Sequence, residues 1–405
     1  MKIKIGLCGL PNSGKSTFIK LVSQVEVLIA SYPFTTLKAQ EYAVPIFSDE
    51  LKLLHSITQT KEVIPPYLFF VDVPGLIRGA HKGDGLGNEF LSYLRGCDVI
   101  LEIVRNFKRE EVPHPEGDIN PLRDIKIIEE EIFLADKEII ERTIKKLEKE
   151  KNKEGEEKIK ALENILTKIY SELNRTNSEL TETNTELVES KIDKIQRFTE
   201  FNELLKEFNL LLTKEWFLLI NGEATDLHGF NSSTDLHGLN LPTDLGGSFK
   251  NVYNLDLLWE IELIESKIQE NEFKPKVFDF LNQFRKDLGL IQFFTFTRDI
   301  TQGWFVKKDS SMIEAATLIH TDFGVKFKIA ETIFLEDFVK ICKSRIDTDL
   351  GTNKYGLLKP LVNTDKNRPR IVADHYWEEA RKLGIIKNKG RDAKVEENEI
   401  IFVKI

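Results

Sequence analysis

The chain is poor in cysteine, with three in 405 residues. Cys8, Cys97 and Cys342 lie far apart and show no spacing typical of a metal site. A disulfide framework of the kind that stabilises small secreted domains is therefore not expected. The three thiols are predicted to be buried in a protein of a reducing compartment, the cytoplasm.

Long apolar runs and an excess of positive charge are also missing. No stretch reaches the roughly 18–20 apolar residues of a membrane-spanning helix, and no signal peptide is expected before the first predicted strand. The formal net charge is −9 at pH 7. This balance argues against a protein that coats nucleic acid over its whole surface, although it is compatible with a local basic face. The length and a hydrophobic content of 41% allow two or three domains.

The most informative stretch is GLPNSGKST, residues 9–17, which matches the phosphate-binding pattern G-x-x-x-x-G-K-[ST]. A predicted strand over 2–9 precedes it and a predicted helix over 15–25 follows it, as the motif requires. In such a loop the backbone N–H groups and the helix N-terminus surround phosphate oxygens. Lys15 is expected to reach the β- and γ-phosphates, and Ser16 to bind Mg²⁺. The loop residues expected to contact a nucleotide are Pro11, Asn12, Ser13, Gly14, Lys15, Ser16 and Thr17.

Two further segments follow where a magnesium–nucleotide site requires them. In SYPFTTLK, Thr35 or Thr36 could complete the Mg²⁺ coordination in a mobile loop, or act only as a local cap. The predicted buried strand over 67–71 ends in Asp72, the position of a Mg²⁺-coordinating acid. Gly75 lies in the turn after it and would bring a backbone N–H group close to the γ-phosphate. Gly75 is therefore predicted to be a catalytic residue, together with Lys15.

The residue after this glycine is Leu76, whereas small GTPases carry there a glutamine that orients the attacking water. Leucine has no hydrogen-bonding side chain, so another group positions the water or hydrolysis is slow. His81 is the one imidazole in the glycine-rich segment that follows, and it is a candidate for this role. A solvent-facing loop histidine is an equally good interpretation of His81.

Residues 124–214 contain almost no glycine or proline and repeat apolar residues at helical spacing. A charged stretch over 151–156 is expected to be the tip between two helices. An antiparallel helical hairpin, inserted in a globular domain, is therefore predicted. Its charged residues form either a solvated face or a docking surface for a partner.

The predicted strand over 216–220 ends at Asn221, the place of a base-reading motif. In guanine-specific proteins this motif is N-K-x-D, whose aspartate accepts two hydrogen bonds from guanine. Here the sequence is NGEATD, with no lysine and with the first acid, Glu223, one position early. Guanine specificity is therefore not supported. The nine-residue repeat over 225–247 that follows is interpreted as an expanded surface loop.

The pattern changes near residue 289. IQFFTFTR and QGWFVKK predict a β-hairpin, and KFKIAETIFL and EIIFVKI predict further strands, with a short helix over 311–320. Residues 289–405 are expected to form a small β-grasp-like domain with an insertion near 347–374. The nucleotide-binding domain is then discontinuous, and its expected parts are 1–123 and 215–288, on either side of the hairpin at 124–214.

These segments together resemble the YchF-type subfamily of the Obg-related P-loop NTPases. The similarity rests on GLPNSGKST, SYPFTTLKAQ, FVDVPGLIRGAHKGDGLGNEFL and IHTDFGVKFKIAETIFL, and it covers most of the chain. The resemblance implies an α/β fold with a Ras-like P-loop NTPase domain, an inserted α-helical coiled-coil hairpin and a C-terminal β-grasp (TGS) domain. It also implies Thr36, in place of Thr35, as the Mg²⁺-sensing threonine. Leu76 matches the family's hydrophobic replacement of the catalytic glutamine.

The resemblance has further implications for the ligands and partners. Members of this subfamily bind and hydrolyse ATP, often in preference to GTP, through an N-x-x-E motif, to which Asn221 and Glu223 correspond here with a shifted acid. Mg²⁺ would be held by Ser16, Thr36 and Asp72. The implied partner is the ribosome, through its large or small subunit and with rRNA or tRNA as further contacts. No membrane partner is expected, and the chain is expected to be a monomer.

The leading hypothesis is thus a cytoplasmic, ribosome-associated, Mg²⁺-dependent ATPase that acts as a translation-linked conformational switch. An Obg-type GTPase is the first alternative, and the departure from N-K-x-D counts against it. A non-hydrolysing, nucleotide-gated adaptor is the second, and the intact phosphate and Mg²⁺ groups count against that one.

Overall fold

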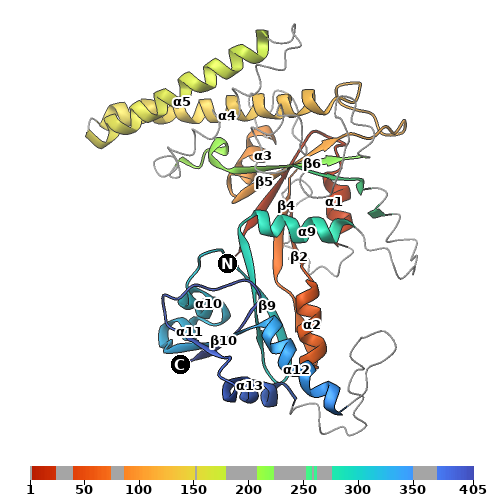
Figure 1. Ribbon diagram of the computed structural model, residues 1–405. Helices are drawn as coiled ribbons and strands as arrows, with labels where there is room; N and C mark the ends of the chain where they lie inside the picture. The colour runs from red at the N-terminus through yellow and green to blue at the C-terminus, as the bar shows by residue number, and fades with distance from the viewer. Residues whose placement is uncertain are drawn as a thin grey trace. The chain divides into compact units, whose positions relative to one another are not determined.

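The computed structural model describes residues 2–23, 40–73, 86–150, 153–178, 208–222, 252–257, 260–261, 276–349 and 372–405. The chain forms two compact units, and each is described by itself (Figure 1). The N-terminal unit comprises residues 2–44 and 69–277, and the C-terminal unit comprises 45–68 and 278–405. Within the described ranges, no helix is long and apolar enough to cross a membrane.

The N-terminal unit is built on a six-stranded sheet with the order β2-β4-β1-β5-β6-β7. β1 pairs in parallel with β4 and β5, and the parallel pairing continues through β6 to β7. The carboxyl ends of these strands therefore meet at one edge, where α/β sheets bind their ligands. The strands are β1 (Lys4–Cys8), β2 (Gln40–Pro45), β4 (Tyr67–Asp72), β5 (Val99–Arg105), β6 (Glu215–Asn221) and β7 (Val252–Leu255).

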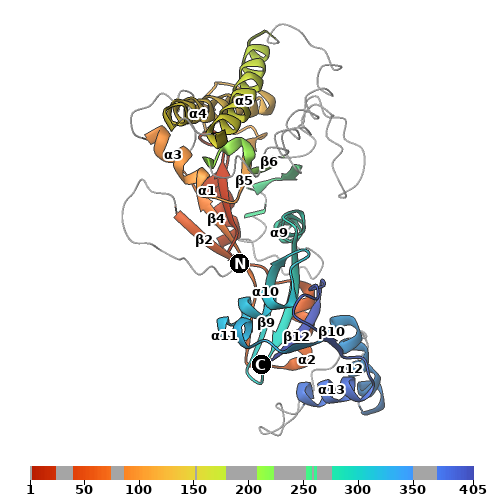
Figure 2. The ribbon, with the colours of Figure 1, turned by 90° about the vertical axis from the view of Figure 1, so that its left-hand side faces the viewer.

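Helices cover both faces of this sheet (Figure 2). On one face, Phe18 of α1 packs edge-on against Phe70 of β4, with ring centroids 5.2 Å apart. On the other, Ile100 of β5 lies in one apolar cluster with Leu94 of α3 and Ile128 of α4. The helical elements are α1 (Lys15–Ser23), α3 (Leu86–Arg95), α4 (Pro121–Glu150), α5 (Lys153–Ser178) and the 3-10 helix η6 (Leu211–Thr213).

The long helices α4 and α5 lie side by side and are separated in the sequence by two residues only (Figures 1 and 2). Their contact is an apolar cluster that includes Ile140 and Ile144 of α4 and Leu162 and Ile165 of α5. The 3.6-residue period of the apolar side chains places them on one face of each helix. The first two helices of the expected hairpin are therefore present, and residues 179–207 lie outside the described ranges.

The C-terminal unit contains a second six-stranded sheet, with the order β11-β10-β12-β8-β9-β3. β8 and β9 form the antiparallel hairpin that the sequence predicts, and β12 pairs in parallel with β8. The mixed sheet agrees with the expected β-grasp type. Its strands are β3 (Glu62–Ile64), β8 (Leu290–Phe296), β9 (Ile300–Lys307), β10 (Ile329–Phe334), β11 (Lys387–Lys389) and β12 (Glu399–Lys404).

Two apolar clusters hold helices on this sheet. Phe293 of β8 and Ala330 of β10 pack with Met312 of α10, whereas Phe294 and its cluster contact α2, α12 and α13. Because neighbouring residues of a strand point to opposite faces, Phe293 packs on one face of the sheet and Phe294 on the other. The helices are α2 (Asp49–Thr58), α9 (Lys276–Asp287), α10 (Met312–Ile319), α11 (Thr321–Lys326), α12 (Leu335–Asp349) and α13 (Val372–Lys382).

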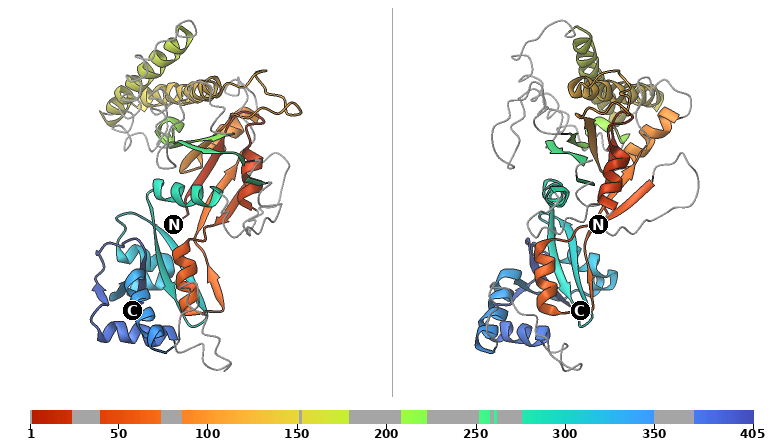
Figure 3. Two further views of the ribbon diagram at one scale, coloured as in Figure 1. Left: turned by 45° about the vertical axis from the view of Figure 1, so that its right-hand side comes forward. Right: turned by 90° about the vertical axis from the view of Figure 1, so that its right-hand side faces the viewer.

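The structure corrects the expected domain boundaries at residues 45–68. The sequence analysis assigns them to the nucleotide-binding domain, but they form α2 and β3 of the C-terminal unit (Figure 3). Ser48 caps α2 and accepts a hydrogen bond of 2.7 Å from Gln292 on β8. Residues 278–288 likewise join the C-terminal unit. The local pattern could not reveal this, because the partners lie more than 200 positions away along the chain.

The three cysteines are free and buried, as the sequence predicts. Burial raises the pKa of Cys97 to about 11 and that of Cys342 to about 12, and it raises the pKa of Cys8 further. These thiols are therefore protonated and unreactive at neutral pH.

We expect Leu54→Ala to destabilise the C-terminal unit by about 2–5 kcal/mol, because the fully buried side chain fills the core between α2 and the sheet. Leu53→Ala is the matched control, since Leu53 is 37% exposed on the same helix and its removal should cost less than about 0.5 kcal/mol. Denaturant unfolding followed by intrinsic tryptophan fluorescence, to which Trp304 and Trp377 of this unit contribute, measures both. Equal stability of the two variants would contradict the assignment of residues 45–68 to this core.

Candidate functional site

The loop between β1 and α1 curls tightly against the neighbouring strands. Gly9 has φ +148°, and a Cβ at this position would lie 2.4 Å from the carbonyl oxygen of Ile103 on β5. Gly14 has φ +113°, and a Cβ there would lie 2.3 Å from the side-chain nitrogen of Asn221. Both positions therefore require glycine. The loop has the shape in which successive N–H groups surround an anion.

The side chain of Lys15 lies inside this loop. It is 7% exposed, and its Nζ donates hydrogen bonds to the carbonyl oxygens of Gly9 at 2.8 Å and Leu10 at 2.9 Å. Burial lowers the pKa of Lys15 to about 8, against the raising influence of Cys8 and Asp72. The ammonium group is thus held by two carbonyl dipoles at the place where phosphate charge is expected.

Asp72 and Ser16 are oxygen donors beside this lysine. Asp72 ends β4, which pairs with β1, and Ser16 is the second residue of α1. Burial raises the pKa of Asp72, and the charge of Lys15 lowers it. The described residues contain no group of three or more histidine, cysteine or acidic side chains that could hold a metal ion by itself. This sparse oxygen set fits Mg²⁺, which binds one or two protein groups together with phosphates and water.

Asn221 joins three segments of the N-terminal unit. It is 1% exposed; its Nδ2 donates to the carbonyl oxygen of Ser13 at 3.0 Å, and its Oδ1 accepts from the backbone N–H of Leu257 at 3.2 Å. The sequence analysis expects Asn221 to read the base. In the structure its amide links the phosphate-binding loop to the segment after β7 by these two hydrogen bonds.

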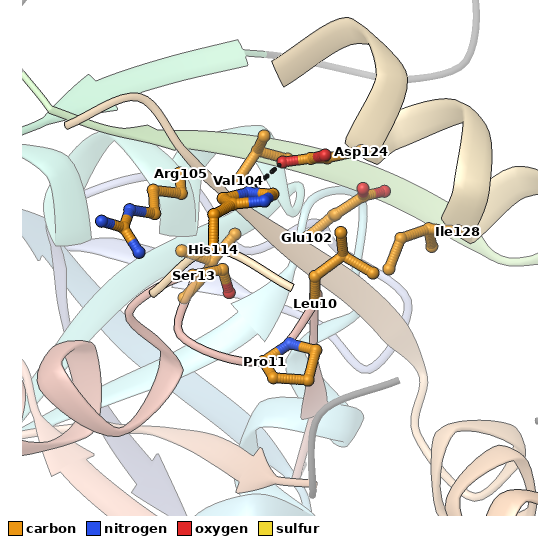
Figure 4. A pocket seen from close by; sticks show the side chains of 10 residues that line it. Leu10, Pro11, Ser13, Glu102, Val104, Arg105, His114, Asp124 and Ile128 are labelled. Carbon is orange, nitrogen blue, oxygen red and sulfur yellow. Dashed lines mark hydrogen bonds and ion pairs between the residues drawn. The ribbon is translucent and has the colours of Figure 1, made fainter. Parts of the chain in front are cut away.

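A second group of side chains lies beside the loop and was not found by the sequence analysis. These side chains line a pocket that is too small to hold a water molecule (Figure 4). His114 and Asp124 form a hydrogen bond of 2.8 Å between Nε2 and Oδ2 in its wall, and both side chains are buried. The other lining residues are Leu10, Pro11, Ser13, Glu102, Ile103, Val104, Arg105 and Ile128.

The connector that carries His114 also contacts the loop directly. The side-chain nitrogen of Asn12 donates a hydrogen bond of 3.0 Å to the carbonyl oxygen of Pro113. Asn12 itself has φ +63°, a left-handed conformation that asparagine tolerates. The backbone N–H of Glu116 donates to Nδ1 of His114 at 3.1 Å, so both ring nitrogens are engaged. A single histidine in a polar connector carries no signal by which sequence reasoning could have placed it here.

The structure brings together the loop residues Pro11 to Thr17, with Asp72 at the end of β4 and Asn221 at the end of β6, on the same edge of the sheet. The other predicted site residues, Thr36, Gly75, His81 and Glu223, lie outside the described residues. A glycine-rich phosphate loop between a buried strand and a helix, with an acid at the end of the neighbouring parallel strand, defines a P-loop nucleotide-binding protein.

Comparisons with known proteins agree with this class. A family model described as 50S ribosome-binding GTPase matches residues 4–152. A second model, the C-terminal domain of YchF GTPases, described as a protein of unknown function, matches residues 290–354. Both matched parts of the chain are thus similar to YchF-type, Obg-related P-loop NTPases.

Individual relatives match the N-terminal part of the chain. Obg-like ATPase 1 of Gallus gallus is 42% identical over 146 residues, which are 36% of this chain and 37% of that protein. Ribosome-binding ATPase YchF of Buchnera aphidicola is 38% identical over 151 residues, 37% of this chain and 42% of that protein. The aligned part thus spans less than half the length of these curated relatives.

One solved structure covers the whole chain. The YchF GTPase of Schizosaccharomyces pombe aligns over 100% of this chain and 98% of its own, with a TM-score of 0.65 and 24% identity. This likeness shows that the chain shares the fold.

We expect Lys15→Met to stabilise the nucleotide-free chain by up to about 3 kcal/mol near pH 7, because it removes a buried ammonium group. The pKa of Lys15 is about 8 in the folded chain and 10.5 in its unperturbed state. Between these values the unfolded chain binds more protons, so the stability of the unchanged chain rises with pH. The advantage of the variant should therefore shrink from about pH 8 upward.

Denaturant unfolding at about pH 7 and about pH 10 tests this, with Lys20→Met as control because Lys20 is exposed on the same helix. A stability difference between Lys15→Met and the unchanged chain that is the same at both pH values would contradict the prediction.

Proposed function

We propose that this chain is a Mg²⁺-dependent nucleoside triphosphatase that hydrolyses ATP in preference to GTP and acts as a ribosome-associated, translation-linked switch in the cytoplasm. The observation that carries the proposal is the buried Lys15 ammonium inside a loop whose glycines leave room only for backbone. An ammonium group held on two backbone carbonyls, in a loop whose N–H groups can face an anion, is complementary to the phosphates of a nucleotide.

The proposed chemistry is attack by water on the γ-phosphate. Lys15 and the N–H groups of residues 11–17 bind the phosphate oxygens and stabilise their charge in the transition state. Ser16 and Asp72 would hold Mg²⁺ with Thr36, and the metal would neutralise charge on the β- and γ-phosphates. Gly75 would offer an N–H group to the γ-phosphate, and His81 would orient the water, because Leu76 has no group for this task.

The choice of base rests on the sequence after Asn221, which lacks the lysine and the aspartate of a guanine site. By the resemblance to the N-x-x-E motif, Glu223 would take part in adenine recognition. The relatives' names include ATPase as well as GTPase, which keeps GTP as the alternative substrate.

The partner proposal comes from the relatives and from the helical hairpin. One curated relative is named a ribosome-binding ATPase. The hairpin of α4 and α5 presents exposed lysines at 145, 146 and 149, which suit a phosphate backbone such as that of rRNA or tRNA. We propose that the hairpin and the TGS-like unit form the docking face, that the chain works as a monomer, and that no membrane is involved.

Turnover of ATP and GTP with Mg²⁺ tests the enzyme proposal. We expect hydrolysis of ATP, tighter binding of ATP than of GTP in titration calorimetry, and a loss of about 100-fold or more in kcat for Lys15→Ala. His81→Ala should lower kcat with little effect on affinity, whereas the exposed Lys20→Ala should match the unchanged chain. Tighter binding of GTP would favour the Obg-type GTPase, and binding without turnover would favour the adaptor. Turnover unaffected by Lys15→Ala would remove the enzyme proposal.

Co-sedimentation with ribosomes, with and without a non-hydrolysable ATP analogue, tests the partner proposal. The triple variant Lys145→Glu, Lys146→Glu, Lys149→Glu should weaken binding, and increasing salt should weaken binding of the unchanged chain, because phosphate contacts release counterions. Lys20→Glu, an exposed change on α1, outside the hairpin and the C-terminal unit, is the control. Absence of co-sedimentation in both nucleotide states would contradict the proposed ribosome association.

A further inference from the structure

The carboxyl group of Glu102 lies in the interior of the N-terminal unit, on β5. It is 1% exposed, and among the described residues its Oε1 atom has no hydrogen-bond partner. On the neighbouring strand β1, Cys8 pairs with Glu102, and Gly9 of the phosphate-binding loop follows Cys8. An uncompensated carboxyl here calls for a reason, because buried polar atoms are nearly always hydrogen-bonded.

Glu102 is part of the pocket beside the phosphate-binding loop (Figure 4). Leu10 and Ser13 line this pocket from the loop, and Asp124 and Ile128 line it from α4. In Figure 4 the carboxyl points toward the start of α4, where Asp124 lies. The side chain therefore stands between the strand that backs the loop and the first turns of the helical hairpin.

The charged groups that face Glu102 are acidic. Burial raises the pKa of Glu102 well above its usual value, and the charges of Glu129 and Asp124 on α4 raise it further. The group across from it on β1 is the thiol of Cys8, whose pKa Glu102 in turn raises. An ionised Glu102 would repel the start of α4 from within the unit.

The basic groups around the pocket contact groups other than Glu102, and Nη1 of Arg105 has no hydrogen-bond partner among the described residues. His114 and Arg123 both pair with Asp124. The guanidinium of Arg105, on the same strand as Glu102, donates to the backbone carbonyls of residues 107 and 109. Within the described part of the chain, no ion pair joins a basic side chain to Glu102.

We propose that Glu102 is a positioning residue of the nucleotide site, which as a neutral carboxyl seats the first turns of α4 beside the phosphate-binding loop. The inference rests on the proposed nucleotide binding and assigns a role that no motif carries. Glu102 acts through the loop and not on the nucleotide itself, so its effect appears in affinity and in pH dependence.

The wall that contains Glu102 touches the loop at both of its ends. At the start, Gly9 packs against the carbonyl oxygen of Ile103, the residue after Glu102. Further on, Asn12 bonds to Pro113, next to the histidine that holds Asp124. A shift of α4 away from β5 would therefore move the loop, because the same connector and strand support it.

The first experiment compares the full-length variants Glu102→Gln and Glu102→Ala in their affinity for Mg²⁺-ATP and Mg²⁺-GTP near neutral pH. Glutamine is a neutral isostere and should keep the affinity within about twofold. Alanine removes the side chain from the pocket lining and should weaken the nucleotide affinity about tenfold. Glu130→Gln and Glu130→Ala, at a half-buried position of α4 outside the pocket lining, should both match the unchanged chain.

The second experiment asks directly whether Glu102 holds a proton. In the infrared difference spectrum between the unchanged chain and Glu102→Gln at neutral pH, we expect the carbonyl stretch of a protonated carboxyl to be lost. The ratio of their nucleotide affinities should stay constant through neutral pH, and any departure should appear only on the alkaline side. This ratio cancels the titration of Lys15, which both proteins share.

The outcomes separate this inference from the proposed function. If the unchanged chain binds neither nucleotide, the proposed function fails. If it binds and Glu102→Gln loses as much affinity as Glu102→Ala, or if the infrared band is that of a carboxylate, the neutral role is wrong. If Glu102→Ala binds normally, Glu102 has no positioning role. Should the alanine variant not fold, the infrared band and the glutamine variant still decide the question.

Discussion

The burial of one ammonium group organises the nucleotide site. Lys15 lies on the carbonyl oxygens of Gly9 and Leu10, and the loop can bring these carbonyls inward only because Gly9 and Gly14 have backbone conformations and contacts that exclude a Cβ. The cost of burying the charge appears as a lowered pKa. A phosphate group would repay this cost, so the same arrangement that destabilises the empty loop favours binding of an anion.

The second constraint is the path of the chain between β2 and β4. After β2 the chain leaves the N-terminal unit, forms α2 and β3 in the core of the C-terminal unit, and returns in β4, whose last residue is Asp72. The segments on either side are those in which Thr36 and Gly75 are expected to sense the γ-phosphate. The core of the C-terminal unit therefore includes residues 45–68, which lie in the sequence between two strands of the N-terminal unit.

The local elements that the sequence predicts from short continuous segments are present in the structure. Three features can be recognised from a few residues each: the loop over 9–17, the acid at the end of β4 and the hairpin of β8 and β9. Turn glycines, strand alternation and the helix period are local signals. Asn221 lies at the end of β6, as the sequence predicts. Only the folded chain shows that its amide links Ser13 of the loop to Leu257 after β7.

What the sequence determined by itself is the phosphate-loop motif and the type of the elements around it, since these follow from residue identity and spacing along one stretch. The tertiary structure decided which distant segments share a core, as residues 45–68 do with the C-terminal sheet, and which polar groups are buried side by side, as His114, Asp124 and Glu102 are. The physical reason is that burial and charge interactions depend on distance in space, and these residues come together only when β5, the connector and α4 pack.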